Sequence, residues 1–307
     1  MLGKVLIIKD GDNDWMAQLM KATGLVDVAD AYKEISYPQK RLRTLHYHLP
    51  GSKAYWYGAW KDSIQNYDTI ILFDSFLATD LPEYIEEHAP KARLIVYYYN
   101  PWYNNYYLSD KARTKCEIWS FDKEDCKKHG LQYNHQFYFY QAAEQQQDAA
   151  YASDIFFIGK DKGRLKFLQD VDKKLRKAGI DTKIFVVPDR IAYDETEKRF
   201  LHQERVSYEE VLKYNKNTRC LLEVVQEYQE GLTMRVVEAM FFAKKLITTN
   251  KLIENYDFYD PQNVYIIGKD TRDLVTFIQN RAAAVWKPDI VYRYSFEDWL
   301  QNFDKQG

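Results

Sequence analysis

Short apolar runs rich in β-branched and aromatic residues recur along this chain, and segments with helical spacing separate them. In the first part of the chain such runs occupy residues 5–8, 69–73, 94–99, 118–121 and 136–140. Asp14 and Asp122 stand at positions expected for helix N-caps between the runs. Strands that alternate with helices in this way predict βαβ units, and therefore a parallel sheet.

The same alternation restarts after residue 152. Apolar runs at 155–159, 184–187, 220–225, 246–249 and 264–267 predict a second parallel sheet. Ser207, with Glu210 three residues later, forms a capping-box pattern that predicts a helix start. The polar, low-complexity stretch 141–152 predicts a linker between the two halves. We therefore expect one Rossmann-like domain at 1–145, a second at 151–290, and a C-terminal helix at 291–307 that packs back toward the first domain.

The composition narrows the class of protein. A length of 307 residues suits two domains, and 46% hydrophobic residues can form a sizeable core. The formal net charge of −2 argues against a general nucleic-acid binder, which is strongly basic. Three widely spaced cysteines without a CxxC pair indicate neither a zinc site nor a disulfide framework, and they favour a reducing compartment. The apolar run at 5–8 is too short for a signal peptide, and no stretch approaches the roughly 18–20 apolar residues of a membrane span, so we expect a cytoplasmic protein.

Residues 31–60 do not fit the alternation. They contain a basic segment at 40–48, KRLRTLHYH, and an aromatic segment at 53–60, KAYWYGAW. One interpretation is a solvated helix face beside partly buried rings. The other is contact with an anionic membrane surface or with a lipid-linked substrate, which would make the protein peripheral on the cytoplasmic face of the inner membrane.

The stretch 230–239, EGLTMRVVEA, carries the most specific signal in the chain. It follows a predicted strand and opens a predicted helix, whose first N–H groups and macrodipole attract anions. Gly231 lets the backbone approach a phosphate closely, and Thr233 and Arg235 supply further donors for its oxygens. Glu238 could accept hydrogen bonds from the paired hydroxyls of a ribose, and Glu230 from those of a transferred sugar. The alternative is an ordinary helix start with acidic residues and an ion pair three residues apart.

Seven residues separate Glu230 from Glu238 at the start of a helix in the second of two Rossmann-like halves. This E-x(7)-E arrangement resembles the nucleotide-sugar glycosyltransferases of the GT-B fold. The runs QEGLTMRVVEA, DIFFIGKDKGR, KLITTN and YDFY are similar to bacterial transferases of capsule, exopolysaccharide and lipopolysaccharide synthesis. The similarity covers residues of roughly 150–303, whereas only the βα pattern is recognisable before them. The resemblance implies an α/β GT-B protein with two Rossmann-like domains whose parallel sheets face each other across a cleft.

The resemblance also implies roles within the 230–239 stretch. Glu238 would bind the ribose of the donor nucleotide, and Glu230, which we count among the catalytic residues, would face the donor sugar. The diphosphate would be bound by Gly231, Leu232, Thr233 and Arg235. The implied substrate is a nucleotide-diphosphate sugar, with UDP-sugars favoured, and the implied activity is that of a glycosyltransferase, a hexosyltransferase in particular.

Two further loops of the second half belong to the donor site in such enzymes. The loop after the strand at 155–159 would bring Gly159, Lys162 and Arg164 to the phosphates, although a solvated basic turn has the same composition. The base is expected near Pro188 and Tyr208. Tyr208 either stacks on the base or packs in the core at a helix start.

The first half would bind the acceptor, a glycan or a lipid-linked oligosaccharide. Candidate contacts are strand-end residues and one histidine of the basic segment, namely Asn13, Ser75, Asn100 and His46. An inverting enzyme needs a base for the acceptor hydroxyl, and Asp12 or Asp74 is our candidate. Strand-end aspartates also form ordinary turns, and a lone surface histidine needs no function. A retaining enzyme needs no such base, because the diphosphate itself can take the proton.

Neither a metal nor another cofactor is expected. GT-B transferases usually stabilise the leaving diphosphate with a helix dipole and basic side chains, and the Asp-x-Asp at 10–12 ends a predicted first strand instead of forming a metal site. Two other functions stay open, a nucleotide-sugar epimerase of the same fold and a non-catalytic partner of a glycosyltransferase complex. The lack of G-x-G-x-x-G after any predicted strand argues against a dehydrogenase.

Overall fold

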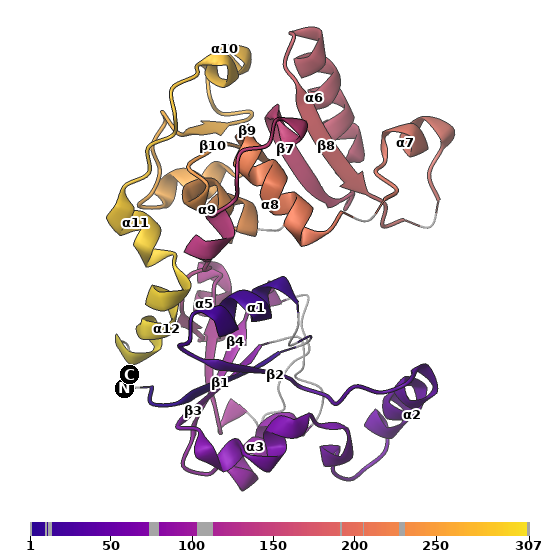
Figure 1. Cartoon of the computed structure of the whole chain (residues 1–307), viewed down its shortest axis with the longest axis vertical. Coiled ribbons are helices and arrows are strands. Elements are labelled where there is room, and N and C mark those ends of the chain that lie inside the picture. The colour runs from indigo at the N-terminus through magenta and orange to yellow at the C-terminus, as the bar shows by residue number, and fades with distance from the viewer. Residues whose placement is uncertain are drawn as a thin grey trace. The chain divides into compact units, whose positions relative to one another are not determined.

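The computed structural model describes residues 2–9, 11, 14–73, 80–102, 113–190, 192–204, 206–226 and 231–305. The chain packs as two compact units, each visible in Figure 1. The first comprises Met1–His135 with Trp299–Gly307, and the second comprises Gln136–Asp298. Each unit holds one parallel sheet with helices packed on it.

The first unit is built on a six-stranded sheet in the order β2-β1-β3-β4-β5-β6, in which all neighbouring strands are parallel. Its strands are β1 (Val5–Lys9), β2 (Asp27–Asp30), β3 (Thr69–Phe73), β4 (Arg93–Tyr98), β5 (Glu117–Ser120) and β6 (Gln132–Tyr133). Its helices are α1 (Trp15–Ala22), α2 (Tyr37–Tyr47), α3 (Leu81–His88) and α5 (Lys123–His129), with short 3₁₀ helices at Ala54–Trp56, Ala59–Asp62 and Ile64–Asn66.

The strands of the first unit bury side chains on both faces, because consecutive residues of a strand point to opposite sides. Leu6 and Leu72 lie in a core cluster with Ile85 of α3. Figure 1 shows α1 on the opposite face of the sheet from α3. Tyr97 of β4 contacts Trp299 of the C-terminal helix α12 (Phe296–Lys305), with the ring centroids 4.9 Å apart.

The second unit is built on a five-stranded sheet in the order β11-β10-β9-β7-β8, again with every neighbouring pair parallel. Its strands are β7 (Ser153–Lys160), β8 (Thr182–Val187), β9 (Thr218–Glu223), β10 (Lys245–Thr248) and β11 (Val264–Ile266). Its helices are α6 (Leu165–Lys177), α7 (Glu195–Phe200), α8 (Tyr208–Asn217), α9 (Met234–Phe241), α10 (Leu274–Gln279) and α11 (Pro288–Arg293), with 3₁₀ helices at Tyr140–Ala143, Ala149–Tyr151 and Lys251–Asn255.

Helices cover both faces of the second sheet. Phe157 of β7 packs in a cluster with Leu168 of α6 and Ile278 of α10. Phe156, the preceding residue, stacks on Tyr214 of α8 with the ring centroids 4.8 Å apart. The near-continuous apolar runs of the sequence therefore correspond to strands that are buried on both sides.

The predicted helix starts are confirmed. Asp14 accepts a hydrogen bond from the Ala17 N–H at 2.8 Å and caps α1, and Asp122 caps α5 in the same way. Ser207 and Glu210 form the capping box of α8. Each side chain satisfies a backbone donor that the first helical turn leaves without a partner.

The predicted strand at 136–140 is wrong, although its aromatic residues suit a strand. The Tyr138 N–H donates to the Tyr294 carbonyl at 2.8 Å, and the Phe296 N–H donates to the Tyr138 carbonyl at 2.9 Å. The stretch therefore pairs with the chain that joins α11 to α12 instead of joining the sheet. The sixth and second strands, β6 and β2, were not predicted, because both are short and contain polar residues.

The division between the units falls between His135 and Gln136, before the stretch 141–152 in which we expected the linker. That stretch packs on α8 in the second unit. Lys216 of α8 donates to the Ala143 carbonyl at 3.2 Å, and the Asp148 N–H donates to Asn217 Oδ1 at 2.7 Å. The polar residues of 141–152 therefore belong to a segment that is hydrogen-bonded to α8.

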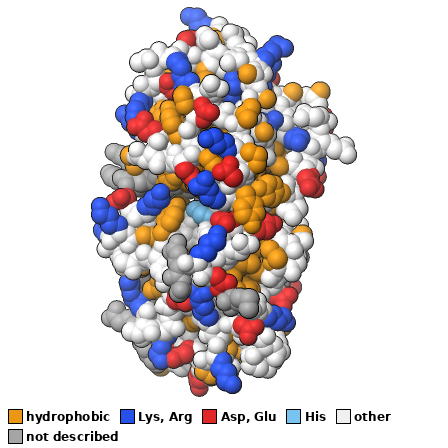
Figure 2. Space-filling model, turned by 90° about the vertical axis from the view of Figure 1, so that its left-hand side faces the viewer, with side chains coloured by type: hydrophobic (Ala, Val, Ile, Leu, Met, Phe, Trp, Pro, Cys, Tyr) orange, Lys and Arg blue, Asp and Glu red, His pale blue; other side chains and the backbone are white. Residues whose placement is uncertain are grey.

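The distribution of charged side chains on the surface fits the near-neutral net charge of the chain. On the face drawn in Figure 2, basic and acidic side chains are interspersed, and hydrophobic side chains form separate groups. Within the described ranges, no helix combines the length and the apolar character that crossing a bilayer demands.

Candidate functional site

The strand order of the second unit changes direction beside β7. The chain passes from β7 to β8 on one side and then crosses to β9 on the other side. In open parallel sheets such a switch point leaves a crevice outside the carboxyl ends of the two central strands, and ligands bind there. The ends of β7 and β9 are therefore the place to look for a site in this unit.

A pocket of about 190 Å³ lies at this position. Strand ends, the loop after β7 and the start of α9 all contribute to its walls. The described residues that line it are Phe157, Ile158, Arg164, Leu222, Glu223, Val224, Thr233, Met234 and Arg235. The sequence predicted three of these, Arg164, Thr233 and Arg235, for the binding of a diphosphate.

Thr233 fixes the N-terminus of α9 against the pocket. Its hydroxyl accepts a hydrogen bond from the Arg235 N–H at 3.2 Å and donates one to Glu223 Oε1. Gly231 and Leu232 precede this N-cap and are buried. The first turn of α9 thus presents N–H groups and the positive end of the helix dipole at the pocket.

Glu223 is a pocket residue that the sequence did not single out. It ends β9, is almost completely buried, and accepts hydrogen bonds from the hydroxyls of Thr233 and Thr248. Burial raises the pKa of its carboxyl above the ordinary value, while the two hydroxyls act in the opposite direction. The available signal was a glutamate inside the apolar run at 220–225, because a carboxyl in a buried strand needs polar partners.

Arg164 brings a guanidinium group to the pocket from the loop after β7. It donates to the carbonyls of Lys160 at 2.6 Å and Asp161 at 3.3 Å, and to the carbonyl of Val224. These acceptors are neutral carbonyl oxygens, so they hold the group in place without cancelling its charge. Burial lowers the pKa of Arg164 from its ordinary value, and a bound anion would offset this desolvation.

Glycine at the strand end leaves room for this arginine. A Cβ at Gly159 would lie 3.1 Å from Arg164 Nη2 and 3.3 Å from the Phe157 ring. Gly159 therefore leaves the space through which the guanidinium group of Arg164 crosses the end of β7. This gives the predicted site residue Gly159 a steric role.

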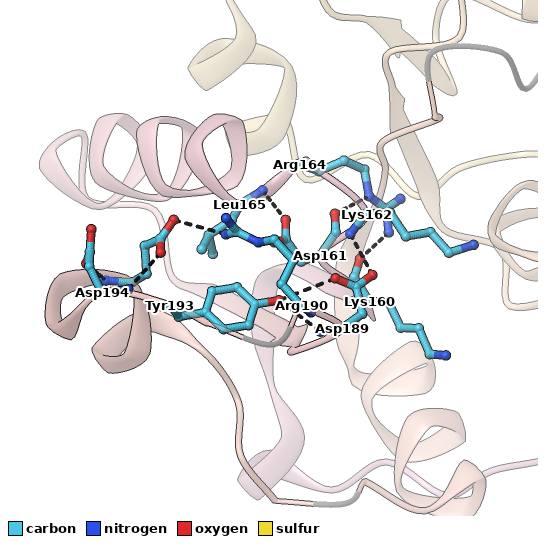
Figure 3. Close-up of polar contacts among 10 residues, drawn as sticks. Lys160, Asp161, Lys162, Arg164, Leu165, Asp189, Arg190, Tyr193 and Asp194 are labelled. Atoms are coloured by element: carbon cyan, nitrogen blue, oxygen red, sulfur yellow. Dashed lines mark hydrogen bonds and ion pairs between the residues drawn. The ribbon is translucent and has the colours of Figure 1, made fainter.

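The loop 160–164 is held by a polar network that reaches the end of β8 (Figure 3). Asp161 is fully buried, accepts from the Leu165 N–H at 2.8 Å, and forms an ion pair with Arg190 at 2.7 Å. Lys162 has a left-handed backbone with φ +44°, and its N–H donates to Asp189 at 2.9 Å. Burial, followed by the charges of Arg164 and Lys160, lowers the pKa of the Lys162 amine.

A second pocket of about 580 Å³ lies beyond this loop, at the carboxyl end of β8. Pro188, predicted near the nucleotide base, is one of its walls. The other described walls are Arg190, Ala192, Tyr193, Lys198, Leu201 and Gln203. Because Arg190 binds Asp161 and Arg164 binds the Asp161 carbonyl, the loop 160–164 connects the walls of the two pockets.

Glu238 lies inside the unit and not in the wall of either pocket. It is only 2% exposed. Its Oε1 accepts from the phenols of Tyr208 at 3.2 Å and Tyr138 at 3.4 Å, and its Oε2 lies 2.7 Å from Arg235 Nη1 in an ion pair. Arg235 also donates to Asn215 at 2.9 Å. The ion pair that we considered as the alternative for this stretch is therefore present.

The remaining predicted residues fall elsewhere. Asn100 follows β4 and is exposed, and His46 lies in α2, where its Nδ1 accepts a hydrogen bond from the Trp56 indole at 2.8 Å. Both belong to the first unit. Outside the described residues lie the candidates Asp12, Asn13, Asp74, Ser75 and Glu230. Among the residues with described positions, no group of three or more His, Cys, Asp and Glu side chains is placed to hold a metal ion.

No protein-family model and no curated protein matches this sequence. Solved structures do match it. A glycosyltransferase of avilamycin A biosynthesis, AviGT4, aligns with 99% of this chain and 96% of its own at 11% identity and a TM-score of 0.53. The catalytic domain of starch synthase IV from Arabidopsis thaliana, bound to ADP and acarbose, aligns with 99% and 98% at 9% identity and a TM-score of 0.49.

These similarities concern the fold. At 11% identity, the match to the avilamycin transferase shows a shared architecture across the whole chain. The protein is therefore an α/β protein of the GT-B class, with two Rossmann-like units that hold parallel sheets of six and five strands.

Proposed function

We propose that this protein is a glycosyltransferase that moves a sugar from a nucleotide-diphosphate sugar to a glycan acceptor. One observation carries the proposal. The pocket at the ends of β7 and β9 combines the N-terminus of α9 with the Arg164 guanidinium group, which contacts neutral carbonyl oxygens, and Arg235, paired with Glu238, lies in the same wall. On a fold shared with a glycosyltransferase, such a set of donors suits a diphosphate.

The diphosphate is the leaving group in this proposal. The bond between the sugar C1 and the β-phosphate oxygen breaks, the bond between C1 and the acceptor oxygen forms, and the acceptor proton passes to a base or to the diphosphate. Arg164 and the N-terminus of α9 are held in place before the reaction and are proposed to stabilise the negative charge on the diphosphate. Lys162, from the same loop as Arg164, is proposed to add a further positive charge. Asp12 or Asp74 is the proposed base if the enzyme inverts, and Glu230 is proposed to bind the donor sugar.

The nucleoside is proposed to extend along the loop 160–164 toward the end of β8. Pro188 and Tyr193 offer apolar faces in the second pocket, whose volume of about 580 Å³ is large enough for a base and its ribose. Gly159 and the backbone of Gly231 and Leu232 are proposed to let the phosphates approach closely. UDP-sugars remain our favoured donors, and a hexose the favoured sugar.

Glu238 and Tyr208 receive a positioning role in this account. Glu238 holds Arg235 and the Tyr208 phenol through the contacts given above, so it fixes one of the two guanidinium groups of the pocket. Direct binding of a ribose by Glu238, the role that the resemblance implies, would require the phenols of Tyr138 and Tyr208 to leave the carboxylate. The two roles make opposite predictions for the stability of a Glu238 variant.

The first unit is proposed to bind the acceptor through Asn13, Ser75, Asn100 and His46. We favour a lipid-linked oligosaccharide acceptor of bacterial surface polysaccharide synthesis, because the resemblance of residues 150–303 is to transferases of that kind. Neither a metal nor another cofactor takes part in the proposed reaction.

Incubation of the full chain with UDP-, GDP- and TDP-sugars, with and without a lipid-linked oligosaccharide, tests the function. The proposal predicts thermal stabilisation by sugars of one nucleotide class and slow hydrolysis that releases the nucleoside diphosphate. When the acceptor is present, it predicts transfer of the sugar. Conversion of the free nucleotide sugar to an epimer without transfer would instead identify an epimerase. Binding without turnover under all conditions would indicate a non-catalytic partner, and either result would overturn the proposal.

A further inference from the structure

Exposed hydrophobic side chains are concentrated in one short part of the chain. Ten large hydrophobic residues of the described part are exposed, and five of them lie within residues 37–55. These five are Tyr37, Leu42, Leu45, Leu49 and Tyr55, and 57–70% of the surface of each residue is exposed. A soluble surface seldom groups apolar side chains in this way unless the group binds something.

Three of these residues, Tyr37, Leu42 and Leu45, lie in the helix α2 and are exposed there. None of its residues is buried. Its inner side is held by Arg43, which lies over the Tyr32 ring at 4.5 Å, and by His46, which accepts from Trp56. Leu42 and Leu45 lie three residues apart in α2, the spacing of one helix face, and the exposed Leu49 follows in the turn directly after the helix. Figure 1 shows α2 at the periphery of the first unit, beyond the edge strand β2.

The same segment is positively charged. Residues 37–55 contain Lys40, Arg41, Arg43 and Lys53 and no Asp or Glu, although the whole chain has a net charge of −2. Lys40 and Arg41 are exposed next to the leucines. Lys53 is buried and donates to the carbonyls of Leu49 at 2.6 Å and Gly51 at 2.8 Å, which fixes the turn that carries Leu49. The face in Figure 2, by contrast, mixes both signs of charge.

We infer that residues 37–55 are a membrane-docking surface for an anionic phospholipid bilayer. The leucines would enter the boundary between headgroups and acyl chains, while Lys40 and Arg41 would contact lipid phosphates, as amphipathic helices with cationic flanks do. A second copy of this chain is a poorer occupant, because the same positive segment would meet itself across a symmetric interface. The surface does not include the donor pocket, so the inference stands whether or not the proposed reaction is right.

Vesicle co-sedimentation of the full chain tests this surface. Vesicles of phosphatidylcholine alone are compared with vesicles that contain phosphatidylglycerol, at low and high salt. We expect binding only to the anionic vesicles and release at high salt, because surface attraction is screened. Lys40→Gln with Arg41→Gln should weaken binding by about 25-fold, since each basic residue near the membrane contributes about fivefold. Leu42→Gln with Leu45→Gln and Leu49→Gln should weaken it at least about tenfold.

Leu25→Gln with Leu252→Gln is the matched control, because these leucines are also exposed, at 48% and 43%, but lie outside residues 37–55. This pair should leave vesicle binding unchanged. Circular dichroism confirms that each variant is folded, and light scattering without lipid reports self-association. The inference is overturned if the wild type does not bind anionic vesicles, or if the triple leucine variant binds them as well as the wild type does. It is also overturned if the leucines form a dimer interface and the dimer does not bind lipid.

Discussion

The buried Glu238 carboxylate contacts Tyr138, Tyr208 and Arg235. It therefore stabilises the positions of all three side chains. Glu238→Ala would leave the Arg235 charge and two phenols without their shared partner. Removing one member of a buried ion pair typically costs about 3–5 kcal/mol. We therefore expect the free energy of unfolding, measured with urea, to fall by about that amount.

Glu238→Gln is the matched variant, because its amide oxygen still accepts from the phenols, and we expect a smaller loss of stability. If Glu238→Ala were as stable as the wild type but had lost affinity for the nucleotide, the carboxylate would be a ribose ligand and not a positioning residue.

Glu223 should give the stability of the protein a distinct pH dependence. Because burial raises its pKa in the folded state, the folded protein binds this proton more tightly than the unfolded chain does. The contribution to stability is therefore complete below the unfolded pKa of about 4.3 and is lost as the pH rises toward the folded pKa. Glu223→Gln keeps the side-chain shape without the titration.

Urea unfolding of wild type and Glu223→Gln between pH 4 and pH 8 measures this effect. We expect the variant to gain stability relative to the wild type as the pH rises, with a slope of at most about 1.4 kcal/mol per pH unit. A difference between the two proteins that does not change with pH would show that Glu223 titrates alike in the folded and unfolded states.

At the level of single residues, sequence spacing predicted which side chains share a pocket better than it predicted their contacts. Arg164, Thr233 and Arg235 line one pocket as expected, because all three lie near strand ends or at a helix start, where topology determines their place. The burial of Glu238 was not foreseen, because it involves Tyr138, which is 100 residues away in the sequence. Glu223 was overlooked for a similar reason, since its partners Thr233 and Thr248 come from two later elements.

Individual helices depend on their caps, and α5 offers a clean test. Asp122 Oδ1 accepts from the N–H groups of Glu124 at 2.9 Å and Asp125 at 3.2 Å. Asp122→Ala removes both hydrogen bonds and should lower the free energy of unfolding by about 1 kcal/mol, or up to about 2. Thermal or urea unfolding checks this value against Lys127→Ala, an exposed change in the same helix. Equal stability of the two variants would mean that solvent caps α5 as well as Asp122 does.

Elements were predictable where the hydrophobic pattern decides the structure. The strands β1, β3 and β4 are almost entirely buried, so the sequence had to be apolar there. The helix α2 buries none of its residues, so it lacks the core-facing apolar stripe by which helices between buried strands are recognised. Phe137, Tyr138 and Phe139 are buried without joining the sheet, and the sequence pattern of such a segment is the same as that of a buried strand.

At the level of the whole molecule, the chain passes between its two units twice, after His135 and before Trp299. The helix α12 spans the second passage, with Phe296 in the second unit and Trp299 in the first. Trp299 is fully buried against Tyr97, and Arg93 donates to the Phe303 carbonyl at 2.7 Å. The end of the chain is therefore a structural part of the first unit.

Trp299→Ala should accordingly destabilise the first unit by about 3–5 kcal/mol, the usual cost of removing a large buried aromatic side chain. Hydrogen exchange followed by mass spectrometry locates the loss, which we expect in β3, β4 and β5. Val285→Ala, an exposed change in the second unit, is the control. Unchanged protection of the first unit in Trp299→Ala would contradict a structural role for α12 there.

Calorimetric titration of the full chain with UDP, GDP and TDP tests the proposed donor site most directly, in wild type, Arg164→Ala and the control Arg176→Ala, whose arginine pairs with Asp172 on α6. The proposal predicts saturable binding of one nucleotide to the wild type and to Arg176→Ala. Arg164→Ala should bind about 10- to 150-fold more weakly, because a hydrogen bond to a charged group contributes about 1.5–3 kcal/mol. Folded wild type that binds none of the three nucleotides, or Arg164→Ala that binds as tightly as the wild type, would contradict it.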